Sequence, residues 1–258
     1  MNMNPTLKLA VSQFPVTGDI AANALYIRQH MRRASQAQAH IVHFPEAALS
    51  GYARVDFASF HGYDWQALGY RTQQICGLAA DLGLWVVLGS ARRMDPRQKP
   101  RNCLHVISPV GSIAGSYDKQ ELHGKENKVY SAGQSPLIMT INRMTCGFLI
   151  CFDSCFPALY DAYRKQGVQL LFHSYYNAKN TGESNSLDDL ILAQLRTRAA
   201  DNGFWISASN SSARHSRLAS CVARPDGSLR SAKRHVPGLI CHDFPDTYLG
   251  WTYDNRKI

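Results

Sequence analysis

Three residues of complementary chemistry follow apolar, strand-like segments of this sequence. Glu46 follows Ile41–Phe44, Lys119 comes just after Ser112–Tyr117, and Cys151 directly follows the apolar run Gly147–Ile150. Because strand ends converge at one edge of the sheet in layered α/β folds, we expect the three side chains to lie close together. A carboxylate, an ammonium and a thiol in that arrangement are suited to attack on a carbonyl or nitrile carbon.

The three side chains would divide the reaction between them. A free cysteine is mostly a thiol at neutral pH, so Cys151 needs a base, and the carboxylate of Glu46 can take its proton. The ammonium of Lys119 would stabilise the thiolate and then the anionic tetrahedral intermediate, with the backbone N–H of Phe152 as a second donor. Glu46 would afterwards protonate the leaving amine and activate the hydrolytic water.

Each of these residues also has an ordinary structural explanation. Free cysteine is among the most buried residue types, and a lone glutamate or lysine after a strand is usually a cap or a surface charge. His43, His123 and His173 lie near the same strand ends and compete with Glu46 as the base, which would give a Cys/His dyad. We rank the dyad second, because no local sequence pattern pairs a histidine with the cysteine.

Strands and helices alternate along the whole sequence, with hairpins between them. The predicted strands are Leu7–Phe14, Ile41–Phe44, Leu84–Gly89, Cys103–Val110, Ser112–Tyr117, Leu137–Ile141, Cys146–Ile150, Val168–His173, Phe204–Ser209, Ser220–Ala223 and Leu229–Ala232. The predicted helices are Asn23–Gln38, Asp64–Leu82, Ala158–Gln166 and Leu187–Asp201. Met94–Asn102, Gln120–Gln134 (with one helical turn) and Ser174–Ser186 are predicted loops, and Leu239–Ile258 is predicted to be irregular. With no linker composition, we expect one α/β domain over residues 1–258.

Composition narrows the function classes. The chain has 258 residues, 45% of them hydrophobic, and no apolar run of the length that spans a membrane. We expect no signal peptide, and the odd number of cysteines, seven, favours a reducing cytoplasm. The net charge is +9, but Lys and Arg are scattered, which favours a solvated surface over a nucleic-acid interface.

Three short motifs, in this order, resemble those of the nitrilase superfamily of carbon–nitrogen hydrolases. They are Phe44-Pro45-Glu46 with Gly51-Tyr52, Tyr117-Asp118-Lys119 with Leu122, and Gly147 with Ile150-Cys151-Phe152-Asp153. Further matches are Glu126, Phe156-Pro157, the segment Arg198–Asn202, Asn210 and Pro225-Asp226-Gly227. The resemblance extends from Leu7 to Phe244.

The resemblance implies a four-layer α-β-β-α sandwich without metal or organic cofactor. It also implies a homodimer in which two sandwiches pack helix layer against helix layer. It assigns Glu46 as base, Lys119 as the group that orients substrate and stabilises the oxyanion, and Cys151 as nucleophile. Glu126 is placed as a second glutamate near the cysteine.

The chain departs from the pattern beside the nucleophile. Many members carry Arg where this chain has Cys155 and Glu where it has Ala158, so a possible ion pair near the cysteine is lost. Cys155 can lie one helical turn from Cys151, which permits a regulatory disulfide or metal capture. We favour ordinary packing of Cys155, because the spacing matches no common zinc site.

The sequence therefore predicts a thiol hydrolase that cleaves a non-peptide C–N bond, most often in a small amide that carries a carboxylate. A nitrile or N-carbamoyl amine is an alternative substrate, an acyltransferase an alternative reaction, and a non-catalytic binding module a further alternative. We expect substrate selection to depend on residues around Cys151, namely Tyr52, Phe152, Tyr175, Tyr176 and Asn177. The competing explanation is that the tyrosines lie on the surface.

Overall fold

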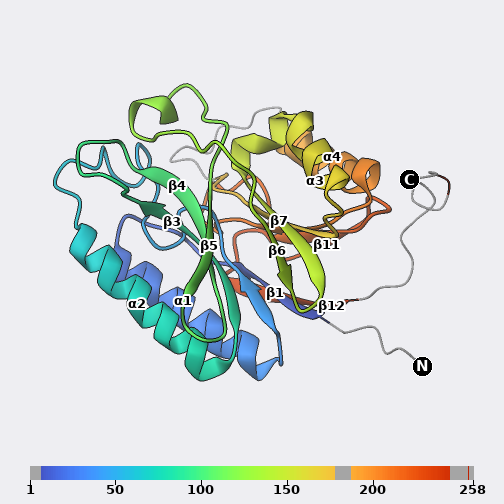
Figure 1. Ribbon diagram of the computed structural model, residues 1–258, viewed down its shortest axis with the longest axis horizontal. Coiled ribbons are helices and arrows are strands. Elements are labelled where there is room, and N and C mark those ends of the chain that lie inside the picture. The colour runs from blue at the N-terminus through green and yellow to red at the C-terminus, as the bar shows by residue number, and fades with distance from the viewer. Residues whose placement is uncertain (1–6, 178–186, 245–254, 256–258) are drawn as a thin grey trace.

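Two β-sheets and four α-helices make up the part of the chain that the structure, a computed structural model, describes: residues 7–177, 187–244 and 255 (Figure 1). The strands of the first sheet are β1 Leu7–Gln13, β2 Ile41–His43, β3 Trp85–Arg92, β4 Arg101–Ile107, β5 Ile113–Asp118 and β12 Gly238–Phe244. The strands of the second are β6 Ile138–Ile141, β7 Met144–Ile150, β8 Leu170–Ser174, β9 Trp205–Ser209, β10 Cys221–Ala223 and β11 Leu229–Ser231. The helices are α1 Ile20–Gln36, α2 Trp65–Leu82, α3 Pro157–Lys165 and α4 Leu187–Asn202, with short 3-10 helices η1 Glu126–Lys128 and η2 Cys151–Cys155.

The two sheets form the inner layers of a sandwich and the helices form the outer layers (Figure 1). The strand orders are β12-β1-β2-β3-β4-β5 and β11-β10-β9-β8-β7-β6. The strands β1, β2 and β3 run parallel, as do β7, β8 and β9, and antiparallel strands flank each group. Helices α1 and α2 cover the first sheet, and α3 and α4 cover the second. The predicted four-layer α-β-β-α architecture is confirmed.

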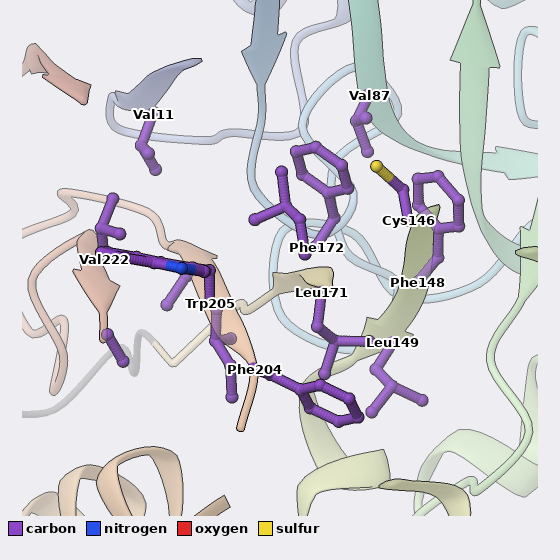
Figure 2. Close-up of a cluster of buried hydrophobic side chains, with 14 of the residues drawn as sticks. Val11, Val87, Cys146, Phe148, Leu149, Leu171, Phe172, Phe204, Trp205 and Val222 are labelled. Carbon is purple, nitrogen blue, oxygen red and sulfur yellow. The ribbon is translucent and has the colours of Figure 1, made fainter. Parts of the chain in front are cut away.

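The main core lies between the sheets and continues beneath α3 and α4. Side chains alternate along β7 and β8, so that Phe148 and Phe172 point toward Val87 of the first sheet, whereas Leu149 and Leu171 point away from it (Figure 2). The rings of Phe148 and Phe172 stack with their centroids 5.4 Å apart. Burial of each such side chain contributes about 1.5–3 kcal/mol to folding, and this packing fixes the distance between the sheet edges that carry the site.

Helix α1 begins earlier than the hydrophobic pattern predicts, at Ile20 rather than at Asn23. The carboxylate of Asp19 accepts hydrogen bonds from the backbone N–H groups of Ala21 and Ala22, at 2.8 and 3.1 Å, and so caps the first turn. The cap sets the start of the helix independently of the apolar periodicity on which the prediction depended.

Two predicted irregular segments contain strands. Residues 239–244 of the stretch Leu239–Ile258, together with the preceding Gly238, form β12, which pairs antiparallel with β1 from Leu7↔Phe244 to Gln13↔Gly238. Asn102, predicted to end a loop, lies in β4. The strand β12 depends on a partner distant in sequence, and the first residues of β4 depend on pairing with the end of β3 across a loop, so local patterns reveal neither. The predicted loop Ser174–Ser186 lies outside the described residues from 178 onward.

Within the described residues, none of the helices combines the length and the apolar character required to cross a bilayer.

A close approach between β3 and the turn after β2 requires a glycine. A Cβ atom on Gly89 would overlap the carbonyl oxygen of Pro45 and would lie 2.9 Å from the backbone nitrogen of Ala47. These two residues flank Glu46, so the missing side chain of Gly89 lets the β2 turn settle against the sheet edge.

We predict that Gly89→Ala lowers the free energy of unfolding by about 1–3 kcal/mol, because backbone atoms on both sides must move to admit the methyl group. Gly77→Ala is the matched control: a Cβ at this exposed position in α2 meets nothing within 4 Å, and the change should stabilise the protein by about 0.5–1 kcal/mol. Urea denaturation of both variants measures the difference. Equal stability of Gly89→Ala and the unsubstituted protein would contradict the prediction.

Candidate active site

Glu46 lies in a tight turn just beyond the end of β2. Its backbone N–H donates to the carbonyl oxygen of Tyr175 at 3.2 Å, and the next residue, Ala47, has a positive φ of 54°. The Glu46 side chain is completely buried. The turn therefore directs a carboxylate inward at the edge of the first sheet instead of toward solvent.

Lys119 follows β5 at the same edge, and its ammonium lies between two carboxylates. The Lys119 Nζ atom is 2.9 Å from Oε1 of Glu46 and 2.8 Å from Oε1 of Glu126. Its backbone is held from both sides, since its N–H donates to Asn102 and its carbonyl accepts from the N–H of Gly133. Glu126 comes from η1 and is also buried. The predicted pairing of Glu46 with Lys119 is thus present as a buried ion cluster that includes Glu126.

Asn102 completes this cluster and was missed from the sequence. Its Nδ2 donates to Oε1 of Glu46 at 2.7 Å and contacts Oε1 of Glu126 at 3.4 Å. Asn102 enters the site because β4 begins where the antiparallel β3 and β5 end. The sequence feature that could have indicated Asn102 is its position at the start of an apolar strand, which pairs with the strand that ends before Lys119.

The electrostatics separate the roles of the two carboxylates. Burial raises the pKa of Glu46, and Lys119 only partly opposes this shift. For Glu126, burial raises the pKa but the ion pair with Lys119 outweighs it, so the pKa is lowered. Burial lowers the pKa of Lys119, but the two carboxylates raise it well above its usual value. These directions favour an ammonium at Lys119 and an ionised Glu126 beside it, and they make Glu46 the more basic of the two carboxylates.

The second oxygen of Glu46 is available for chemistry. Oε1 accepts from both Lys119 and Asn102, whereas the buried Oε2 has no hydrogen-bond partner within the described part of the chain. A buried carboxylate oxygen without a donor costs free energy, and such atoms are uncommon in folded proteins. Oε2 can therefore accept a proton without breaking an existing contact.

Cys151 occupies a strained backbone position between β7 and η2. Its φ of 43° lies in the left-handed region, which non-glycine residues adopt at a cost of about 1–3 kcal/mol. Asp153, which is buried, fixes the turn: Oδ2 accepts from the N–H of Ile150 and the hydroxyl of Tyr117, both at 2.8 Å. Its Oδ1 accepts from the N–H of Glu121 at 2.9 Å. Backbone strain of this kind concentrates at functional sites, where it presents a side chain in a required direction.

The sulfur of Cys151 is within the electrostatic reach of the ion cluster. Burial and the charge of Glu46 raise its pKa well above the ordinary value, while Lys119 and a hydrogen bond from the backbone of Tyr176 act in the opposite sense. The thiol contacts Oδ1 of Asn177 at 3.7 Å. The raised pKa favours the thiol form of Cys151 at neutral pH, in which a nucleophilic role would need a base to take the proton.

The three histidines that compete with Glu46 as the base contact groups other than the sulfur of Cys151. Both ring nitrogens of His43 bond to serine hydroxyls, of Ser207 at 2.8 Å and Ser174 at 2.7 Å. His173 contacts the backbone carbonyl of Cys151 rather than its sulfur. His123 contacts the hydroxyl of Tyr52 at 3.1 Å. These contacts favour Glu46 over the Cys/His dyad as the partner of the thiol.

A cavity of about 610 Å³ opens beside Cys151. Its lining includes all of the predicted substrate-selecting residues, which are Tyr52, Phe152, Tyr175, Tyr176 and Asn177. Tyr52 and Tyr176 stack in parallel with centroids 4.9 Å apart, and Tyr175 is only 1% exposed. The alternative that these tyrosines lie on the surface is wrong, because the cavity wall buries them. The Tyr175 hydroxyl is turned toward His173.

Cys155 also lines this cavity, and it is exposed rather than packed in the core. Its sulfur lies 4.0 Å from the hydroxyl of Ser154 and 3.9 Å from the amide nitrogen of Gln194. The prediction that Cys155 is packed in the ordinary way is therefore wrong, because its side chain is exposed at the cavity. Cys151 and Cys155 are both free thiols, and no cluster of metal-ligating side chains occurs within residues 7–177 and 187–244.

Comparison with known proteins identifies the family. The chain matches the sequence profile of the carbon-nitrogen hydrolase family over residues 8–245. Omega-amidase NIT2 of Bos taurus is 29% identical over 214 residues, which cover 80% of this chain and 74% of the relative. Deaminated glutathione amidase of Homo sapiens is 24% identical, with 93% of this chain and 83% of the relative covered.

A solved structure shares the whole architecture. A variant of an amidase from Nesterenkonia AN1, of the nitrilase superfamily, superposes with a TM-score of 0.80 over 98% of this chain and 96% of that chain, at 23% identity. At this level of identity the likeness concerns the fold. Because the family profile spans nearly all of the chain, this protein belongs to the carbon–nitrogen hydrolase family of the nitrilase superfamily and is an enzyme that acts on C–N bonds other than peptide bonds.

Proposed function

We propose that this protein hydrolyses a small-molecule amide through a thioester on Cys151, with Glu46 as proton acceptor and donor and Lys119 as oxyanion stabiliser. The observation that carries the proposal is the buried Glu46–Lys119–Glu126 cluster beside a cavity lined by Cys151. Burial of three charged groups is costly to folding, and replacing such groups with apolar residues is often neutral or stabilising. A catalytic role explains why the cluster is kept.

The acylation step follows from these positions. The Cys151 sulfur attacks the amide carbonyl carbon while its proton passes to Oε2 of Glu46. Two protons of the Lys119 ammonium are directed at Glu46 and Glu126, and the third is left for the developing oxyanion. The backbone N–H of Phe152 is the second donor. Collapse of the tetrahedral intermediate breaks the C–N bond, and the proton on Glu46 goes to the leaving ammonia or amine.

Deacylation reuses the same carboxylate. Glu46 takes a proton from water, the resulting nucleophile attacks the thioester, and the carboxylic acid leaves as the proton returns to the Cys151 sulfur. No net proton or electron is consumed, so the cycle requires only amide and water. The raised pKa of Glu46 suits a group that must both accept and release a proton in each turnover.

The relatives support an amide over a nitrile. Two of them are amidases by name, an omega-amidase and a deaminated glutathione amidase. A variant of the Nesterenkonia amidase carries the acetamide moiety of fluoroacetamide covalently at its active-site cysteine. Arg54 and Lys125 in the cavity lining support our preference for an amide that also bears a carboxylate.

Other parts of the sequence-based interpretation remain predictions. A nitrile or N-carbamoyl substrate and transfer of the acyl group to an amine use the same three residues. A second pocket for an acceptor amine would favour transfer. A binding-only role predicts that an electrophile does not trap Cys151. Five further expectations also remain predictions. They are the single domain over residues 1–258, the homodimer, the cytoplasmic location, the absence of nucleic-acid partners and the absence of a cofactor.

A panel of amides, nitriles and N-carbamoyl amines, read by ammonia release, tests the reaction class. We predict release from amides, loss of all release in Cys151→Ala, and retention of most activity in Cys155→Ala, since the charges of Glu46 and Lys119 act on the sulfur of Cys151. Cys155 is the matched control because it lines the same cavity. Equal loss in both variants would instead indicate a dithiol mechanism.

We predict that Glu46→Gln slows turnover by about 10²–10⁴-fold, because glutamine cannot accept the thiol proton or activate water. Intact-protein mass spectrometry during turnover should show slow acylation or an accumulating acyl-enzyme. Glu121→Gln serves as the control, since the backbone of Glu121, rather than its carboxylate, contacts the site through Asp153. Normal turnover by Glu46→Gln would contradict the assignment and would reopen the case for His43 or His173 as base.

A further inference from the structure

The backbone carbonyl of Cys151 has a side-chain partner from the neighbouring strand. Nε2 of His173 lies 3.3 Å from this oxygen. His173 belongs to β8, which runs parallel to β7, and Leu149 pairs with His173 in that register. The contact therefore connects the second sheet directly to the residue whose φ is 43°.

The contacts of His173 fix which nitrogen carries its proton. A carbonyl oxygen only accepts, so Nε2 must be the protonated nitrogen. Nδ1 is then an acceptor, and the hydroxyls of Tyr160 and Tyr175 each lie 3.1 Å from it. Hydrogen bonds to one ring nitrogen determine the tautomer and so the role of the other. The carbonyl selects this tautomer, and the tyrosine hydroxyls, which can donate as well as accept, are compatible with it.

The environment keeps His173 neutral and immobile. The residue is completely buried, and its ring stacks on that of Tyr175 with centroids 4.2 Å apart. Burial lowers its pKa to about 3, against a smaller opposing effect of the Cys151 carbonyl, and the charge of Lys119 lowers it further. His173 is therefore unsuited to act as a proton carrier, but it is a rigid donor at a defined position.

We propose that His173 is a positioning residue whose Nε2–H holds the Cys151 carbonyl and thereby the left-handed backbone conformation that presents the sulfur to the cavity. The inference depends on the proposed role of Cys151 as nucleophile. His173 contacts the backbone carbonyl of Cys151 rather than its sulfur, and it does not itself line the cavity, although its ring packs on Tyr175 of the cavity wall. Without this donor, the backbone of Cys151 relaxes toward commoner φ values and the sulfur points along a different direction.

Two substitutions separate the donor from the bulk of the ring. In His173→Gln the side-chain amide nitrogen can reach the position of Nε2, so the hydrogen bond to the Cys151 carbonyl is kept. In His173→Asn the shorter side chain can serve the tyrosine hydroxyls near Nδ1 but does not reach the carbonyl. We expect His173→Asn to lower kcat for an amide about tenfold with KM nearly unchanged, as for loss of one hydrogen bond. His173→Gln should restore most of kcat.

Alkylation of Cys151 by iodoacetamide, located by peptide mass mapping, provides a readout that does not require a known substrate. The alkylation rate should fall in His173→Asn and recover in His173→Gln, while thermal unfolding shows that both variants are folded. Similar kcat and alkylation rates in the two variants, or losses that follow only the drop in Tm, would overturn the proposal. Alkylation that depends on His173 as expected, in a protein that hydrolyses no amide, would instead refute the proposed function alone.

The unsubstituted protein offers a test that does not depend on folding of a variant. In ¹⁵N-histidine NMR at neutral pH, the signal that disappears in His173→Gln should show a neutral ring protonated at Nε2. A ring protonated at Nδ1, or at both nitrogens, could not position the carbonyl as proposed and would overturn the inference.

Discussion

The site depends on one interaction, the contact of the Lys119 ammonium with two buried carboxylates. Each of these charged groups would be unstable alone in the interior, because removing a charge from water costs several kcal/mol even after relaxation. Together with the Asn102 amide they stabilise one another through Oε1 of each carboxylate, and Lys119 is fixed with one proton left unassigned. Removal of Lys119 would leave two buried carboxylates without a counter-charge, so the strand ends that supply the cluster must be positioned together.

The fold supplies that precision through backbone contacts rather than through the charges themselves. The Glu46 turn packs against the sheet only because Gly89 has no side chain, and a Cβ atom on Gly133 would lie 2.9 Å from the carbonyl carbon of Asp118 beside Lys119. Both glycines lie where loops from different elements pass close to each other. The sandwich core between the sheets then sets the separation between this edge and Cys151, which directly follows β7 of the other sheet.

The strand and helix pattern predicted an α/β fold, the motif resemblance implied the sandwich, and strand ends with short motifs indicated Glu46, Lys119 and Cys151, because these are local features. It was not sufficient for groups that enter the site through space. Asn102 reaches Glu46 because β3 and β4 pair antiparallel, and β12 exists because β1 offers a free edge. The φ of Cys151 is likewise invisible in the sequence, since it results from the contacts of Asp153 and from the β7–η2 junction.

The two oxygens of Glu46 show how one side chain can be both structural and reactive. Oε1 is held by Lys119 and Asn102, which fixes the position of the carboxylate, and Oε2 remains without a donor within the described residues. A carboxylate bonded equally at both oxygens would be a stabilised anion with a low pKa and a weak base. A carboxylate without a hydrogen bond at either oxygen would not be fixed in place, and the interior would not keep it ionised. Bonding on one side alone fixes the carboxylate and leaves Oε2 free to take a proton, which is the combination required by the general-base role that we propose for Glu46.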